Sequence, residues 1–152
     1  MDSESNDPRS IGALAVTADD IVAALEARHQ HDRPVVLRVT PPFSGRMRAR
    51  LHVVDGDPEA ATGGERTVGM PSPLHVAPSA LVDGDAPAYP RPAETEDDLR
   101  ADPNAEYTVD RHHERHRERV ASWRERIRDH FVAETTLETP GGDVRVDVAV
   151  LG

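Results

Sequence analysis

The stretch that decides the fold spans residues 34–53 and reads PVVLRVTPPFSGRMRARLHV. Its first part alternates apolar residues with others, which predicts a strand over 35–40 with one apolar face. The run 41–45 contains two Pro and one Gly and predicts a turn. Strict alternation resumes over 46–54, so the sequence predicts a second strand that pairs with the first in a hairpin.

Further elements are predicted on both sides of this hairpin. Residues 18–30 have apolar positions at helical spacing behind a Thr17 cap, and residues 109–132 do so behind a Thr108 cap. On the long helix the expected apolar stripe comprises Val109, His113, His116, Val120, Trp123, Ile127 and His130. The remaining expected elements are strands 11–16 and 74–77, a helical turn 78–82, a short helix 95–101 and a closing hairpin of 134–139 with 144–151.

These elements predict an α+β protein. Residues 11–152 are expected to form a single domain with a mostly antiparallel sheet of about five strands and two helices packed on one face. Residues 1–10 are polar and are expected to form a disordered tail. The segment 83–106 is rich in Pro and acids and is expected to be a loop apart from its short helix.

The composition indicates a habitat more clearly than an activity. The chain has 18 basic residues, all of them Arg, against 28 acids, and its net charge is −10. Excess carboxylates keep a surface hydrated in concentrated salt, so we expect a cytoplasmic protein of an extreme halophile. Without Cys there can be no disulfide, thiolate metal site or Cys nucleophile. The acidic start does not resemble a secretory signal, and no apolar run reaches the roughly 20 residues that a membrane span needs.

Basic residues gather in two parts of this acidic chain, residues 34–54 and residues 107–131. Residues 34–54 contain four Arg and no acid. On two neighbouring strands the side chains that face away from the core are expected to share one face. This candidate binding face consists of Arg38, Arg46, Arg48, Arg50 and His52.

Two interpretations of that face remain open. Guanidinium groups form bidentate contacts with carboxylate and phosphate, so the face could bind an acidic protein or an anionic ligand. Alternatively, acids of the same chain pair with it, the candidates being Glu94, Glu96, Asp97 and Asp98. Nucleic acid is a less favoured partner, because the net charge is negative and the five aromatic residues offer few stacking platforms.

A histidine cluster gives a second candidate site. His112 and His116 are four residues apart, and His113 and His116 are three apart, so pairs of imidazoles share a helical face. Such spacing is compatible with a divalent metal, the one cofactor that the sequence suggests, with a third ligand from Glu106, Asp110, His52 or His75. The alternative is that His113 and His116 pack as half-buried neutral rings.

Familiar catalytic motifs are missing. The Gly pairs at 63–64 and 141–142 lack the Lys of a phosphate-binding loop, and there is no Gly-x-Ser-x-Gly elbow. No Ser has a neighbouring pattern typical of a triad, so no catalytic residue is assigned and an enzyme is not favoured. The favoured hypothesis is a non-enzymatic interaction or regulatory module that uses the Arg face, and the alternative is a metal-binding protein or metal-dependent enzyme.

Four stretches carry a resemblance that covers most of the chain. They are residues 34–53, quoted above, HVAPS at 75–79, AYPRP at 88–92 and the helix start YTVDRHH at 107–113. Together they resemble a small haloarchaeal family of unknown function. The resemblance implies a salt-rich habitat and carries over no catalytic or binding residue.

Overall fold

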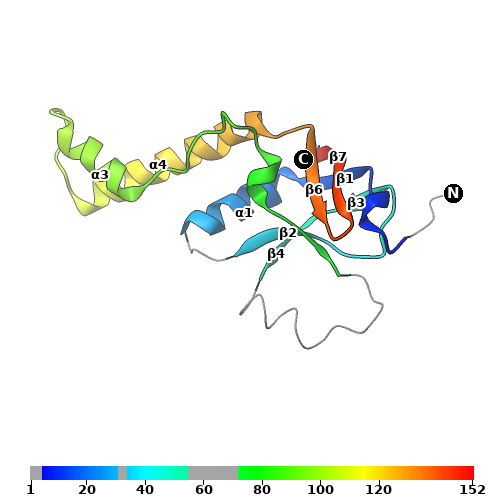
Figure 1. Ribbon diagram of the computed structural model, residues 1–152. Helices are drawn as coiled ribbons and strands as arrows, with labels where there is room; N and C mark the ends of the chain where they lie inside the picture. The colour runs from blue at the N-terminus through cyan, green and yellow to red at the C-terminus, as the bar shows by residue number, and fades with distance from the viewer. Residues whose placement is uncertain (1–4, 31–33, 55–71) are drawn as a thin grey trace. The chain divides into compact units, whose positions relative to one another are not determined.

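The computed structural model describes residues 5–30, 34–54 and 72–152 (Figure 1). They divide into two compact units, one formed by residues up to Asp83 together with Phe131–Gly152, the other by Gly84–His130. The predicted α+β class is confirmed, with three α-helices and two sheets among the described residues. The single domain expected over 11–152 stays a prediction.

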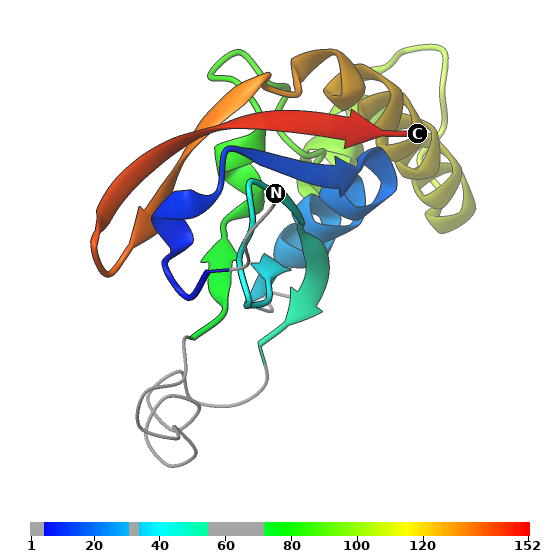
Figure 2. The same ribbon diagram turned by 90° about the vertical axis from the view of Figure 1, so that its right-hand side faces the viewer.

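The first unit contains a four-stranded sheet with the order β3-β1-β7-β6. Strand β1 pairs in parallel with β3 on one side and with β7 on the other, whereas β6 and β7 form an antiparallel hairpin. Figure 2 shows β7 running between β1 and β6. The strands are β1 (Ala13–Thr17), β3 (Arg46–Arg48), β6 (Glu134–Thr139) and β7 (Gly142–Leu151).

The second sheet of this unit is antiparallel and has three strands in the order β4-β2-β5. It contains β2 (Val35–Val39), β4 (Arg50–Val53) and β5 (Leu74–Val76). Helix α1 (Ala18–Gln30) packs against β2 and β4, and the 3-10 turn η2 (Pro78–Leu81) contacts α1. The expected Thr17 cap is confirmed, because its hydroxyl oxygen accepts the backbone N–H of Asp20 at 3.1 Å.

Alternation along the strands builds the core of the first unit. In β1, β2 and β5 every second side chain is buried, and α1 turns one apolar face toward them. The core is mostly aliphatic, as the composition requires. Its most deeply buried large side chains are Leu14, Val16, Ile21, Val35, Leu37, Val39, Phe43, Leu81 and Val146.

The expectation of a single five-stranded sheet is wrong. The predicted strand 46–54 is divided at Ala49 into β3 and β4, which belong to different sheets. Ala49 is fully buried there, and its N–H donates to the carbonyl of Ala15 at 2.9 Å. Just before β3, the carbonyl of Gly45 accepts from the N–H groups of Gly12 and Ala13 at 2.8 and 2.9 Å, which directs this part of the chain to β1. Only β4 forms the predicted antiparallel pair with β2.

Residues 5–10 of the expected disordered tail make defined backbone contacts, while the disordered tail as a whole stays a prediction. Ser5 exchanges two backbone hydrogen bonds with Phe43, at 2.6 and 2.7 Å. Residues Pro8–Ser10 form the 3-10 turn η1, which Asp7 caps by accepting the N–H of Arg9. Residues 1–4 of the predicted tail lie outside the described residues.

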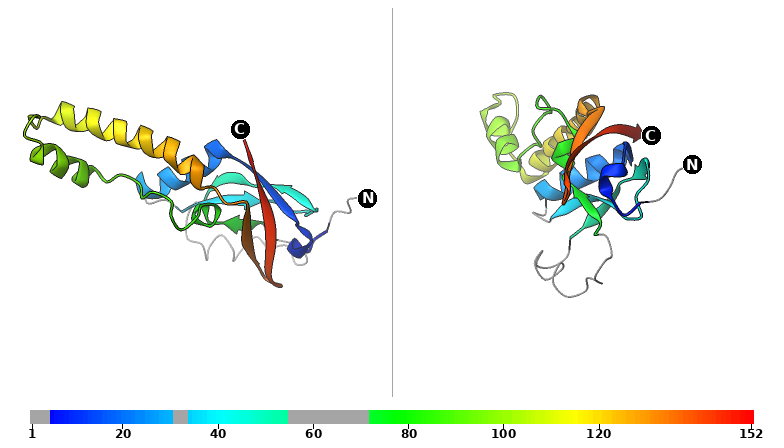
Figure 3. Two further views of the ribbon diagram at one scale, coloured as in Figure 1. Left: turned by 90° about the horizontal axis from the view of Figure 1, so that it is seen from above. Right: turned by 45° about the vertical axis from the view of Figure 1, so that its right-hand side comes forward.

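The second unit is a helical hairpin of α3 (Pro92–Ala101) and α4 (Val109–Ile127), followed by the 3-10 turn η3 (Arg128–His130). Figure 3 shows α3 and α4 side by side. Trp123 anchors the connecting segment: its Nε1–H donates to the carbonyl of Pro87 at 3.0 Å, and the ring of Tyr89 meets its face edge-on at 4.9 Å. Part of the segment 83–106, which was expected to be a loop, is therefore held in place by contacts with Trp123 of α4.

The apolar stripe expected on the long helix needs correction. Val109 is 69% exposed and His113 is exposed, whereas His112 and His116 are half-buried in line with buried Val120. A step of four residues back from His116 brings His112 to within about 40° of its direction around the helix, whereas the step of three to His113 leaves about 60°. The predicted Thr108 cap is confirmed, since its hydroxyl accepts the N–H of Arg111 at 3.0 Å.

The division at Ala49 yields a testable prediction. Replacing Ala49 with Leu places a large side chain where the alanine is fully buried, and overpacking of this kind costs about 1–3 kcal/mol of unfolding free energy. Ala149 on β7 is exposed, so Ala149→Leu is the matched control and should change stability by no more than about 0.5 kcal/mol. Urea unfolding followed by circular dichroism measures both. Equal stability of the two variants would contradict the described environment of Ala49.

Candidate functional site

The Arg face predicted from the sequence is centred on Arg38. Because Val35, Leu37 and Val39 are buried, Arg38 lies on the opposite face of β2. Its register partner on β4 is Arg50, and its partner on β5 is His75. Directly opposed side chains in antiparallel pairs have Cβ atoms about 4.5–5.5 Å apart. Arg50, Arg38 and His75 therefore form a row across the three strands, which we call the cationic row.

Arg46 and Arg48 belong to β3 of the other sheet rather than to the face that carries Arg38. Arg48 nevertheless lies near Arg38 and Arg50, because all three side chains line a hollow of about 360 Å³ where the chain passes from β3 to β4. Arg46 is exposed and takes no part in it. The lining residues, which we call the arginine pocket, are Arg38, Thr40, Met47, Arg48, Arg50, Leu51 and His52.

No carboxylate of the described residues lines the arginine pocket, although the chain carries 28 acids. Within the described residues, no ion pair joins Arg38, Arg48 or Arg50 to an acid. The Nε of Arg38 is buried and has no hydrogen-bond partner there. Leaving a buried donor unsatisfied costs about 1–3 kcal/mol, and more when the donor is charged. The pocket is thus short of an anionic acceptor.

Two of the acids that the sequence offered as internal partners are paired elsewhere. Glu96 accepts from Arg100 at 3.1 Å, and Asp98 accepts from Arg119 at 2.7 Å, both inside the second unit. Glu94 and Asp97 are exposed. Among these four acids, the described contacts give no support for internal neutralisation of the Arg face.

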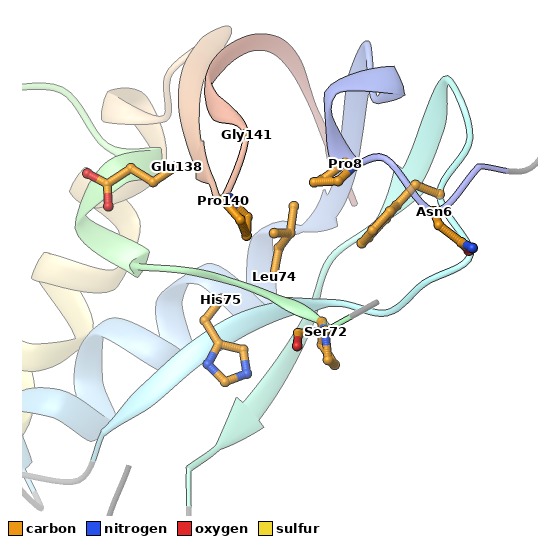
Figure 4. Close-up of a pocket in the computed structure, with 10 residues that line it drawn as sticks. Asn6, Pro8, Ser72, Leu74, His75, Glu138, Pro140 and Gly141 are labelled. Carbon is orange, nitrogen blue, oxygen red and sulfur yellow. The ribbon is translucent and has the colours of Figure 1, made fainter. Parts of the chain in front are cut away.

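From the sequence, His75 was named only as a candidate third metal ligand and not as part of the Arg face, although the alternation of Leu74, His75 and Val76 already placed it on the polar face of its strand. Figure 4 shows the side chains of Leu74 and His75 on opposite sides of β5. The rings of His75 and His52 have centroids 5.8 Å apart. Burial lowers the pKa of His75, and the nearby His52 and Arg38 lower it further by repulsion. The site therefore disfavours additional positive charge.

A mostly apolar hollow of about 460 Å³ lies beside β5, and its wall includes Pro8, Phe43, Leu74 and Pro140 (Figure 4). Glu138 and His75 are its titratable lining residues. The two are not hydrogen-bonded to each other in the described contacts. This hollow therefore offers shape and apolar surface without an assembled acid–base pair.

The histidine cluster of the second unit joins two helices. His112 donates from Nε2 to the carbonyl of Pro92 at 2.8 Å. The hydroxyl of Thr95 donates to the carbonyl of Arg91 at 3.3 Å, so its oxygen accepts the Nδ1–H of His116 at 2.9 Å. Both rings thereby connect α4 to the first turn of α3, and His113 remains exposed. Half-buried packing of neutral rings was the alternative expected for His113 and His116. Of these two residues, only His116 is half-buried.

These hydrogen bonds leave few ligand atoms for a metal ion. His112 and His116 stack with centroids 6.2 Å apart, and their remaining lone pairs are on Nδ1 of His112 and Nε2 of His116. The described residues contain no group of three or more His, Cys, Asp or Glu side chains placed to hold a metal. The metal site at His112, His113 and His116 stays a prediction to which the structure adds no third ligand.

Fold and site together define a small α+β protein whose described residues form an arginine-lined pocket at the junction of two sheets. The chain belongs to the family described as domain of unknown function DUF8009, whose family model matches residues 1–152. No curated protein and no solved structure matches the chain. The expected membership of an uncharacterised family is confirmed, and the haloarchaeal origin stays a prediction. None of the helices in the described ranges has both the length and the apolar character needed to cross a membrane.

The environment of His116 predicts a pH dependence of stability. Burial lowers its pKa, as does repulsion from His112, Arg119 and His113, so the unfolded chain binds a proton at higher pH than the folded protein does. The stabilising contribution of neutral His116 is full above about pH 6.5 and is lost as the pH falls through the pKa of the folded state. We therefore expect the unfolding free energy to decrease between about pH 7 and pH 5.

Urea unfolding at a series of pH values and constant salt measures this decrease. His116→Gln should show a shallower pH dependence than the wild type. Ser122→Gln, at an exposed position of α4, is the control and should keep the wild-type slope. An unchanged slope in His116→Gln contradicts the assignment.

Proposed function

We propose that this protein is a non-enzymatic interaction module that holds an anionic group of an acidic partner protein in the arginine pocket. One observation carries the proposal: the buried Nε of Arg38 has no hydrogen-bond partner among the described residues, in a pocket lined by two further arginines and no acid. Arg38 and Arg50 are also direct register partners, and like charges placed opposite each other destabilise a sheet. A bound anion offsets both costs.

The chemistry of the lining residues favours binding over catalysis. Guanidinium groups keep their proton at any physiological pH, so the three arginines serve as fixed donors rather than as general acids or bases. Thr40 offers the one hydroxyl of the pocket, and His52 the one imidazole. No third group among the lining residues orients that His toward the Thr, so the arrangement that activates a hydroxyl nucleophile has no support here.

We propose further that the protein works in the salt-rich cytoplasm of a halophile. The net charge of −10 and the complete use of Arg in place of Lys support this setting. At about 1 M salt the Debye length is near 3 Å, so attraction over longer distances is screened. Direct bidentate hydrogen bonds act within about 3 Å and therefore persist in such salt, and Arg forms them better than Lys does. A recessed pocket of arginines therefore suits recognition under these conditions.

Charge reversal tests the binding face. Arg48 and Arg50 are exposed, so Arg48→Glu/Arg50→Glu should leave the fold intact while repelling an anion. The probes are an Asp/Glu-rich peptide and a phosphoserine peptide, titrated by fluorescence anisotropy at about 0.5 M KCl. We expect this double variant to lose affinity for its preferred probe by about 10- to 100-fold, the value of one or two charge-assisted contacts.

The matched control is Arg117→Glu/Arg126→Glu, which makes the same charge change on exposed positions of α4. It should bind like the wild type. Absence of binding by the wild type to either peptide, or an equal loss in both double variants, overturns the proposal. Unfolding of Arg48→Glu/Arg50→Glu would assign the arginines to the structure instead.

The proposed setting predicts a dependence of stability on salt. Self-repulsion among excess carboxylates weakens as ions screen it, so the thermal unfolding midpoint should rise between about 0.1 M and 2 M KCl. Circular dichroism during heating measures the midpoint. A midpoint that is constant or falls over this range argues against adaptation to concentrated salt.

A further inference from the structure

We propose that the group held at this site is a phosphate monoester, bound by Arg38 and Arg50 with His75 and His52 beside it. The inference rests on the function proposed above and names the chemical class of the ligand. It follows from the number, direction and charge of the donors that the two sheets bring together.

Donors approach the site from four strands. The cationic row contributes Arg50 from β4 and Arg38 from β2 to the arginine pocket, and His75 from β5 lies beside Arg38 outside the pocket lining. Arg48 at the end of β3 adds a third guanidinium from the other sheet. His52 follows Arg50 on β4 by two residues, which places both on the same face of the strand, and its ring lies 5.8 Å from that of His75.

This donor set exceeds what one carboxylate can use. A carboxylate presents two oxygens in a plane and one negative charge, which a single bidentate guanidinium fork already neutralises. A phosphate monoester presents three oxygens directed away from its ester bond and carries a charge of about −1.5 to −2 near neutral pH. Several guanidinium groups converging without any carboxylate match the tetrahedral dianion better.

The histidines provide a second criterion. His75 faces Arg38 on β2 and the ring of His52 on β4, and neither of these neighbours is an acid. In the empty site burial and the surrounding positive groups hold the pKa of His75 below its ordinary value. A bound dianion cancels that repulsion and favours the protonated ring, so binding should raise the pKa of His75. By linkage, affinity should increase as the pH falls from about 8 to 6.5, until the phosphate itself gains its second proton near pH 6.

The test uses the full chain and four probes at about 0.5 M KCl: phenyl phosphate, benzoate, inorganic phosphate and a phosphoserine peptide with its unphosphorylated form. Calorimetry measures the affinities, and NMR of the imidazole C–H signals follows the titration of His75 with and without phenyl phosphate. We expect phenyl phosphate to bind about tenfold more tightly than benzoate, and the His75 midpoint to move to higher pH. The phosphoserine peptide should bind more tightly than inorganic phosphate if the source is a protein rather than a free anion.

Three variants locate the effect. Arg50→Gln removes one exposed member of the cationic row and should weaken phenyl phosphate binding by about tenfold. Arg46→Gln makes the same charge change on β3 outside the pocket and should bind like the wild type. His75→Asn should keep binding at about pH 8 and lose most of the gain on acidification.

The possible contrary results distinguish failure of the phosphate assignment from failure of the interaction module. Benzoate binding as tightly as phenyl phosphate, with the loss in Arg50→Gln preserved, overturns the phosphate assignment and leaves the interaction module standing. An unchanged His75 midpoint on saturation with phenyl phosphate also overturns the phosphate assignment. Absence of binding by all of these probes overturns the phosphate assignment, and absence of binding by the Asp/Glu-rich peptide as well overturns both proposals.

Discussion

The passage of one chain segment from one sheet to another at Ala49 is the constraint on which the rest of the first unit depends. Only a small side chain suits a fully buried position with sheet on either side, and the hydrogen bond to Ala15 holds the backbone there. The residue before the crossing, Arg48, ends β3, and the residue after it, Arg50, begins β4. A hollow with cationic walls is the direct geometric result, because both sheets contribute side chains to one point.

The sequence predicted the elements better than their partners. The caps at Thr17 and Thr108 and the closing hairpin β6–β7 depend on neighbouring residues, so local patterns were sufficient to find them. The crossing at Ala49 leaves no such signal, because alternation with a period of two is the same whether a strand continues or changes sheets. Parallel pairing of β1 with β7 joins residues far apart in the chain, and alternation cannot specify it.

At the candidate site, too, the sequence predicted local placement better than the partners of each strand. Arg38, Arg50 and His52 were placed on one face correctly because β2 and β4 do form the predicted antiparallel pair. Arg46 was expected beside them and is exposed outside the pocket, because its strand belongs to the other sheet. His75 was named only as a third metal ligand, since its neighbours in the sheet are set by the register of β5 on β2. In a chain dominated by acids, the informative feature is a stretch that excludes them.

The position of β7 has a consequence for the order in which the protein can assemble. Ala13 at the start of β1 pairs with Asp147, and the whole second unit lies between them in sequence. A ribosome delivers β1 long before its principal partner, so β1 cannot acquire that neighbour until residues 147–151 have been made. Contacts of such high sequence separation slow folding, whereas the hairpin α3–α4 needs only local contacts and can form earlier. The helical unit is thus free to fold during synthesis, and closure of the four-stranded sheet is the late event.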